Sequence, residues 1–237
     1  MTDLDPEVLE NTLKIFRQKS DGLGQLRTLI QLGKTYQAKR QYQKALTYSR
    51  QALNLVQNEA NRDDRIIAMV NMGCIYWEMA QLKKAMDLFQ DSLPIAKELR
   101  DDVGQRMLCA IMGISYWRKG EWSNAIDWFE QALQACPDSQ IETYASQPIN
   151  FWKYEGLKVV MERGIATLKN RIQIAQNQND PVRILLPSFS MLPLMLFTGR
   201  KGEIPCLMEK IVLLAQKLKK NKILDTIPRL QKLIGIN

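Results

Sequence analysis

Two pairs of adjacent carboxylates, Asp63–Asp64 and Asp101–Asp102, are the residues whose types and spacing best suit acid–base chemistry or metal binding. Each pair stands where a helix is predicted to begin, and a helix N-terminus favours negative charge without any further role. The chain contains no histidine, which excludes imidazole metal ligands and every nucleophile activated by histidine. No phosphate-binding loop or metal-ligand spacing occurs in the sequence. We therefore predict that the protein is not an enzyme and uses no metal or cofactor.

The other reactive residues are four cysteines, Cys74, Cys109, Cys136 and Cys206. None belongs to a Cys-x-x-Cys pair, and each lies in an apolar segment with helical spacing, which predicts small buried core residues. The N-terminal residues carry no apolar signal core, and no segment reaches the roughly 20 consecutive apolar residues of a membrane helix. We expect no disulfide bonds, no membrane span and a cytoplasmic location.

The net charge of +8 is concentrated at the C-terminal end. Residues 200–237 hold nine Lys or Arg and three Asp or Glu, a balance of +6, which leaves +2 for the first 199 residues. The basic residues that could contact phosphates there are Lys217, Lys219, Lys220, Lys222, Arg229 and Lys232. Because no aromatic residue follows Phe197, base stacking is not expected and nucleic acid is not favoured. Binding of a nucleic acid or an anionic surface through this end remains an alternative.

The elements that would position these residues are set by an internal repeat with a spacing of 40 residues. Three kinds of residue recur in register: Gly33, Gly73 and Gly113; Tyr36, Tyr76 and Tyr116; Ala45, Ala85 and Ala125. The small residues let two helices approach closely, and each tyrosine fills the space beside their crossing. Apolar residues recur at three- and four-residue steps, which predicts helices. The breaks between these segments are short, so consecutive helices must be antiparallel neighbours.

Phe89 and Phe129, then Ala52 and Ala132, and finally Pro137 continue the register. This order of small residue, Tyr, Ala, Phe, Ala and Pro resembles the tetratricopeptide repeat family over residues 22–137. The usual period of that family is about 34 residues, so the chain looks like the long-helix subgroup that includes kinesin light chains and bacterial peptide-sensing regulators. The resemblance implies an all-α fold, a right-handed α-α superhelix of antiparallel helix hairpins. The expected parts of this single repeat domain over 1–237 are a half-repeat helix at 5–19, repeats at 22–60, 62–100 and 102–140, degenerate repeats at 141–179 and 181–220, and a basic capping helix at 222–237.

The resemblance also implies a peptide-binding groove, because the first helix of each hairpin lines the concave face in this family. The residues expected there are Arg27, Gln31 and Lys34 in the first repeat, Asn71, Cys74 and Trp77 in the second, and Met107, Ile111, Ile114, Trp117 and Arg118 in the third, with Gln147, Asn150, Phe151 and Tyr154 as a continuation. The row changes from basic and amide to apolar and aromatic, which suits an extended peptide or helix with acidic and apolar residues. The alternative is that Trp77 and Trp117 only pack in the core.

From these patterns we predict a non-catalytic protein–protein interaction module, an adaptor or scaffold that holds a segment of another protein. A second reading is a regulator that senses a peptide, because each unit of a repeat stack touches only its neighbours and the stack bends readily. Such stacks could also pair through their ends to form a homodimer.

Overall fold

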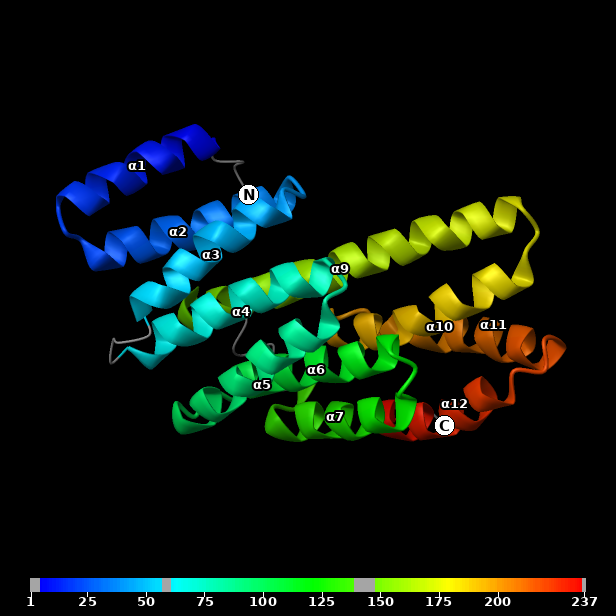
Figure 1. Cartoon of the computed structure of the whole chain (residues 1–237). Coiled ribbons are helices and arrows are strands. Elements are labelled where there is room, and N and C mark those ends of the chain that lie inside the picture. Colours follow the sequence, from blue (N-terminus) through cyan, green and yellow to red (C-terminus); the bar gives the residue numbers. More distant parts are fainter. Residues whose placement is uncertain (1–4, 57–60, 139–147, 236–237) are drawn as a thin grey trace. The chain divides into compact units, whose positions relative to one another are not determined.

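The structure is a computed structural model that describes residues 5–56, 61–138 and 148–235, without the side chains of 148–152. The described residues form eleven α-helices and one short 3₁₀ helix and contain no strand, which confirms the all-α fold class. The helices are α1 (Pro6–Gln18), α2 (Gly22–Ala38), α3 (Tyr42–Val56), α4 (Arg62–Glu78), α5 (Leu82–Glu98), α6 (Asp102–Arg118), α7 (Trp122–Ala135), α9 (Pro148–Asn177), α10 (Pro181–Phe197), η1 (Lys201–Glu203), α11 (Ile204–Lys217) and α12 (Asn221–Ile234) (Figure 1). None of these helices is both long and apolar enough to span a bilayer.

The chain divides into two compact units, which are described separately. Unit 1 contains the described residues up to Gly104 and those from 148 to Gly156, so it holds α1 to α5 and the first turns of α6 and α9. Unit 2 contains residues 105–138 and 157–235, which complete α6 and α9 and add α7 and α10 to α12.

In unit 1 the helices pack as successive antiparallel neighbours, α1 on α2, α2 on α3, α3 on α4 and α4 on α5. The first helices of consecutive hairpins, α2 and α4, also contact each other. Each first helix begins at an equivalent polar residue, Asp21, Asn61 or Asp101. The side chain of Asp21 accepts a hydrogen bond from the backbone of Gly24 at 2.9 Å, and Asp101 does the same for Gly104 at 2.9 Å. These caps satisfy donors that a helix start leaves unpaired.

The turn inside each hairpin is the same structure repeated every 40 residues. Arg40, Ala80 and Gly120 all have a positive φ, at 57°, 59° and 78°. The residue after each of these donates its backbone N–H to the carbonyl of the repeated tyrosine. The distance is 2.9 Å from Gln41 to Tyr36 and from Gln81 to Tyr76, and 3.1 Å from Glu121 to Tyr116. This is the hydrogen-bond pattern of a Schellman C-cap, which reverses the chain within a few residues.

The glycines of the repeat stand at close helix contacts, as their spacing predicts. A Cβ atom on Gly73 would lie 2.4 Å from the ring of Phe89, and one on Gly113 would lie 2.4 Å from the ring of Phe129. Both phenylalanines are fully buried. A larger residue at either glycine would therefore push the two helices of its hairpin apart.

Unit 2 differs from unit 1 because apolar side chains from the C-terminal helices complete its core. Helix α10 packs on α11, α11 packs on α12, and α12 packs back on α7. Helix α10 is the most apolar of these elements, and Phe189 and Leu192 are buried within it. Helix α12 buries Ile223, Ile227 and Leu230 on one face and keeps charged residues on the other, which suits a terminal capping helix.

The fourth repeat expected at 141–179 does not form a hairpin over its described residues. A single helix, α9, runs without interruption from Pro148 to Asn177 (Figure 1). The landmark glycine of the repeat is replaced there by Lys153, and residues 159–161, which align with the hairpin turns of the earlier repeats, include no turn residue. Helices α10 and α11 occupy the segment expected for the fifth repeat, and α1 and α12 occupy those of the half-repeat and the capping helix.

Candidate functional site

The inner side of unit 1 contains a pocket of about 710 Å³, which we call the α2–α4 pocket. Its described lining residues come from three elements: Arg27, Ile30, Gln31 and Lys34 from α2; Asn61, Asp63, Asp64 and Ile67 from the start of α4; and Lys153 and Glu155 from α9. Three residues of the predicted groove, Arg27, Gln31 and Lys34, are thus brought together in one cavity. They lie at three- and four-residue steps along one face of α2.

Most charges in the α2–α4 pocket already have a partner within unit 1. The ammonium group of Lys34 lies 3.4 Å from the carboxylate of Glu155, and that of Lys153 lies 2.5 Å from Asp63. Asp64 accepts a hydrogen bond from Asn61 at 2.7 Å. Arg27 is different, because it is exposed and makes no hydrogen bond or ion pair with any residue that the structure describes. The pocket therefore presents one guanidinium group for an incoming acceptor.

Residues 153–156 of α9, which we call the 153–156 turn, dock beside this pocket. Tyr154 is buried, and its hydroxyl donates a hydrogen bond of 3.0 Å to Asp101. Gly104 provides the space for this ring, since a Cβ atom there would lie 2.2 Å from the tyrosine oxygen. Burial, together with the charge of Asp101, raises the pKa of Tyr154, so the hydroxyl keeps its proton. The ammonium group of Lys153 lies 3.7 Å from Asp101 as well.

The predicted groove residues of the second repeat are core residues in this chain. Asn71, Cys74 and Trp77 are all buried. Asn71 donates a hydrogen bond of 3.0 Å to Ser49, directly beside Gly33. The thiol of Cys74 faces the 153–156 turn, because a Cβ atom on Gly156 would lie 3.4 Å from its sulfur. The prediction of an open groove at these positions is corrected, since the chain itself covers them.

In unit 2 the predicted residues Met107, Ile111, Ile114 and Trp117 are also buried. The ring of Trp117 lies 4.6 Å from that of Phe189 on α10, centroid to centroid. The rings of Trp122 and Phe129 complete the cluster, each 6.0 Å from Trp117. Trp117 is therefore a core residue, as the alternative interpretation predicts, because Phe189 of α10 covers the ring face that an open groove would leave exposed.

Arg118, at the end of α6, is the one predicted groove residue of unit 2 that is exposed. Partial desolvation and the nearby charge of Arg171 lower the pKa of its guanidinium. Of the expected continuation of the row, Tyr154 is the buried residue described above, whereas Gln147 and the side chains of Asn150 and Phe151 lie outside the described residues. Cys206 is exposed, in contrast to the prediction, and the other three cysteines are buried.

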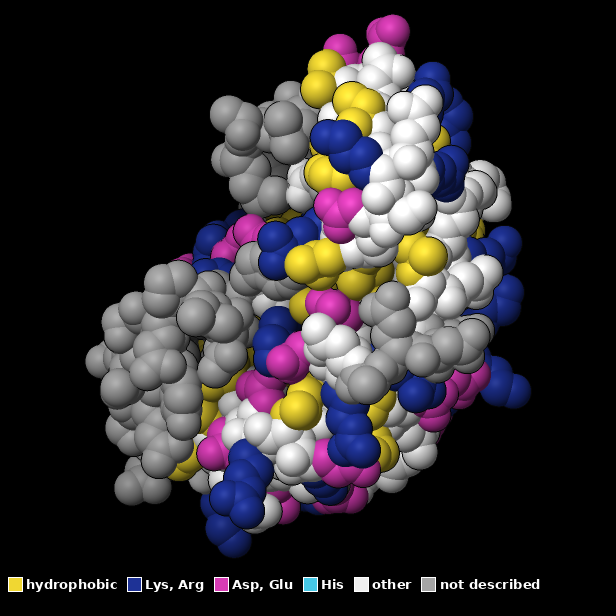
Figure 2. Space-filling model, turned by 90° about the vertical axis from the view of Figure 1, so that its left-hand side faces the viewer, with side chains coloured by type: hydrophobic (Ala, Val, Ile, Leu, Met, Phe, Trp, Pro, Cys, Tyr) yellow, Lys and Arg dark blue, Asp and Glu magenta, His cyan; other side chains and the backbone are white. Residues whose placement is uncertain are grey.

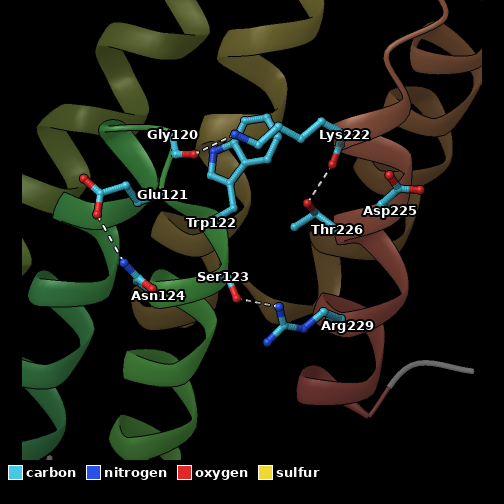
Figure 3. A pocket seen from close by; sticks show the side chains of 9 residues that line it. All are labelled: Gly120, Glu121, Trp122, Ser123, Asn124, Lys222, Asp225, Thr226 and Arg229. Carbon is cyan, nitrogen blue, oxygen red and sulfur yellow. Dashed lines mark hydrogen bonds between the residues drawn. The ribbon is translucent and has the colours of Figure 1, made fainter.

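A second pocket, of about 430 Å³, lies in unit 2 between the start of α7 and α12 (Figure 3). The ammonium group of Lys222 lies 4.8 Å from the centre of the Trp122 ring and donates a hydrogen bond of 3.2 Å to the carbonyl of Gly120. Arg229 donates a hydrogen bond of 2.9 Å to Ser123. Two of the six basic residues considered for an anionic partner thus hold α12 against α7. On the face shown in Figure 2, basic and acidic side chains are intermixed.

The adjacent carboxylates have the role that their position predicts. Asp63 and Asp64 lie in the first turn of α4, Asp102 lies in the first turn of α6, and Asp101 caps that helix. Among the described residues no group of three or more metal-ligating side chains comes together. Asp63 and Asp101 have a second role, as partners of Lys153, that the sequence does not predict. No sequence signal links them, because Lys153 follows Asp63 by 90 positions.

Comparison with known proteins agrees with this structure. Tetratricopeptide repeat models match residues 24–98 and 108–142. The chain is a tetratricopeptide repeat protein. Repeats of this family generally serve protein interaction or regulation and not catalysis. No curated protein sequence matches this tetratricopeptide repeat protein.

Solved structures show the same helical solenoid fold at low sequence identity. BtubC (BKLC) from P. vanneervenii is 14% identical, with a TM-score of 0.51 over 90% of this chain and 91% of that one. The apo form of RapI is 14% identical, with a TM-score of 0.54 over 96% and 77%. A Signal Transduction ATPase with Numerous Domains (STAND) protein with a tetratricopeptide repeat sensor, from Pyrococcus horikoshii, is 17% identical, with a TM-score of 0.53 over 95% of this chain and 35% of that one.

Proposed function

We propose that this tetratricopeptide repeat protein is a non-catalytic adaptor that holds an acidic segment of a partner protein in the α2–α4 pocket. The observation that carries the proposal is the exposed guanidinium of Arg27, which has no partner among the described residues and shares a pocket with Gln31 and Lys34. A guanidinium pairs with a carboxylate through two parallel hydrogen bonds, which gives both attraction and orientation.

The neighbouring residues support the same choice of partner. The amide of Gln31 can donate to and accept from the backbone of an extended peptide. Ile30 and Ile67 add an apolar wall to the same cavity, which suits a residue beside the acidic one. The chain itself places a carboxylate on this face, since Glu155 pairs with Lys34 at 3.4 Å. The side of the pocket that α2 forms is therefore suited to acidic side chains.

The basic C-terminal end is a weaker candidate for the binding site. Lys222 and Arg229 are occupied by contacts with α7, and the remaining lysines line no described pocket with an aromatic surface. Three cysteines, Cys74, Cys109 and Cys136, are buried and form no disulfide, which is compatible with the reducing cytoplasm that we propose as the compartment.

The test is an array of synthetic peptides that vary in acidic and apolar content, probed with the full chain. We expect the retained peptides to be enriched in Asp and Glu and their binding to fall at least tenfold in Arg27→Glu. Lys83→Glu, which reverses another exposed charge on α5 outside the pocket, is the matched control and should retain them. Equal binding by the two variants, or no acidic enrichment, would rule out the pocket assignment.

A further inference from the structure

The 153–156 turn occupies the inner face of unit 1 in the manner of a bound ligand. In a regular stack, each first helix contacts the layer next to it, so a helix in the fourth layer should not reach the first. Here Glu155 contacts Lys34 across 121 positions, Lys153 contacts Asp63 across 90, and Tyr154 contacts Asp101 across 53. One helical turn thus touches the first helices of three successive repeats.

Three residues of the turn, Lys153, Tyr154 and Glu155, each have a complementary subsite. The cation of Lys153 lies between two carboxylates, at 2.5 Å from Asp63 and 3.7 Å from Asp101. The ring of Tyr154 fills the space left by Gly104, and its hydroxyl donates to Asp101. The carboxylate of Glu155 pairs with Lys34. The face therefore accepts a basic residue, a tyrosine and an acidic residue, in that order, on a helix.

We propose that the 153–156 turn is a built-in occupant of this face, and that the partner carries a helical basic–tyrosine–acidic segment that displaces it. This inference rests on the proposed function, because it names the partner of the same surface. The partner's acidic residue would replace Glu155 at Lys34, in the pocket that Arg27 also lines. Its tyrosine would take the place of Tyr154 beside Gly104.

The contacts of the turn suit an exchangeable occupant. The side chains of Lys34 and Glu155 are 21% and 36% exposed, and that of Asp63 is 46% exposed. Exposed ion pairs are weak and are screened by salt, so they can be replaced by equivalent pairs from another chain. The side chains of Lys153 and Asp101 are less exposed, at 11% and 6%, and Tyr154 is the most deeply buried contact, in a space that is specific for its shape. Substitution of Tyr154 therefore removes the most buried contact of the turn and leaves its ion pairs as the remaining contacts.

The experiment uses a fluorescent peptide with the sequence of residues 148–165 as the probe and fluorescence anisotropy as the readout. The full chain with Tyr154→Ala has a vacant tyrosine subsite, and we expect it to bind the peptide at least tenfold more tightly than the unaltered chain. A peptide in which the same tyrosine is alanine should lose this gain. Adding Gly104→Ala to the vacated chain should also remove it, because the new methyl group takes the space of the ring.

A second vacating variant guards against misfolding of the first. Lys153→Ala with Glu155→Ala keeps the buried ring but removes both ion pairs, and it should bind the peptide about threefold more tightly than the unaltered chain. Circular dichroism establishes that each variant keeps its helices. The proposal is overturned if neither folded variant gains affinity, or if the gain survives Gly104→Ala.

The two proposals can fail separately. Arg27 makes no hydrogen bond or ion pair with the 153–156 turn, so Arg27→Glu should leave binding of the 148–165 peptide to the vacated chain within twofold. Loss of the acidic array peptides in Arg27→Glu tests the pocket alone. If the vacated chain does not bind the 148–165 peptide, only the proposal that the 153–156 turn is a built-in occupant is overturned.

Discussion

The two units cover the inner positions of their repeats by different chemistry. In unit 1 the 153–156 turn contributes ion pairs and one hydrogen-bonded tyrosine. In unit 2 the corresponding side of Trp117 is packed against Phe189, Trp122 and Phe129. Polar contacts near water can be exchanged for those of another molecule, whereas a dry aromatic cluster is lost only on unfolding. The comparison indicates that unit 1 is the part of the chain suited to recognition and unit 2 the part suited to stability.

The largest effect should come from breaking the aromatic cover of unit 2. Phe189→Ala removes a fully buried ring and leaves a cavity beside Trp117, so the free energy of unfolding should fall by about 3–5 kcal/mol. Urea denaturation followed by tryptophan fluorescence measures this loss. Leu186→Ala, at an exposed site on the same helix, should change it by less than about 0.5 kcal/mol. A Phe189→Ala loss as small as that would show that the cluster does not stabilise unit 2.

A smaller loss is expected for the anchor of unit 1. Tyr154→Phe keeps the ring but removes its hydrogen bond to Asp101, which should lower the free energy of unfolding by about 1–2 kcal/mol. Asp101 keeps its bond from the Gly104 backbone, which limits the loss. Tyr42→Phe is the matched control, because Tyr42 has no partner among the described residues. Equal stability of both variants would argue against the hydrogen bond.

A weaker effect on stability should distinguish the ion pairs of unit 1 from the aromatic cluster of unit 2 by its dependence on salt concentration. Lys34→Glu and Glu155→Lys should each destabilise the chain slightly, and the double reversal should restore a coupling energy of about 0.5 kcal/mol at low salt. That coupling should disappear near 1 M salt because of screening, while the loss in Phe189→Ala should persist. A coupling that is independent of salt would contradict the ion-pair assignment.

The smallest effect should be the acid sensitivity of Glu10 in unit 1. Hydrogen bonds from Tyr48 and Tyr36, at 2.7 and 2.8 Å, hold the pKa of this carboxyl below its ordinary value of 4.5. Its contribution is therefore complete above the pKa of the unfolded state and is lost as the pH falls through the lower pKa of the folded state. Glu10→Gln should lose less stability than the unaltered chain between neutral and acid pH. Parallel pH profiles for the two proteins would contradict this role.

The sequence predicted the regular part of the fold because a local pattern determines it. Gly73 and Gly113 meet Phe89 and Phe129 in the same way, and the register of Tyr76 and Tyr116 recurs in identical turns. Capping residues and breaks in apolar periodicity act over a few positions, so one sequence is sufficient to read them. Residues 141–179 lack these signals, and the structure has one long helix over their described part.

The state of the predicted site depends on contacts that no local pattern carries. Trp117 and Arg27 occupy the same face of their repeats, but one is buried under Phe189 and the other is exposed. Whether an inner position is open depends on which distant segment folds over it, and periodicity is the same in both cases. The sequence therefore predicts which residues share the face, and it does not predict which of them another segment of the chain covers.

The backbone turns offer a route to engineering that leaves the inner face untouched. Arg40 and Ala80 adopt the left-handed conformation that Gly120 adopts at the equivalent place without a side-chain penalty. Both side chains are exposed, so glycine at either site removes a local strain of about 1 kcal/mol and deletes no buried contact. Glycine at these turns should therefore raise the free energy of unfolding. That added stability would allow substitutions on the recognition surface that lower it.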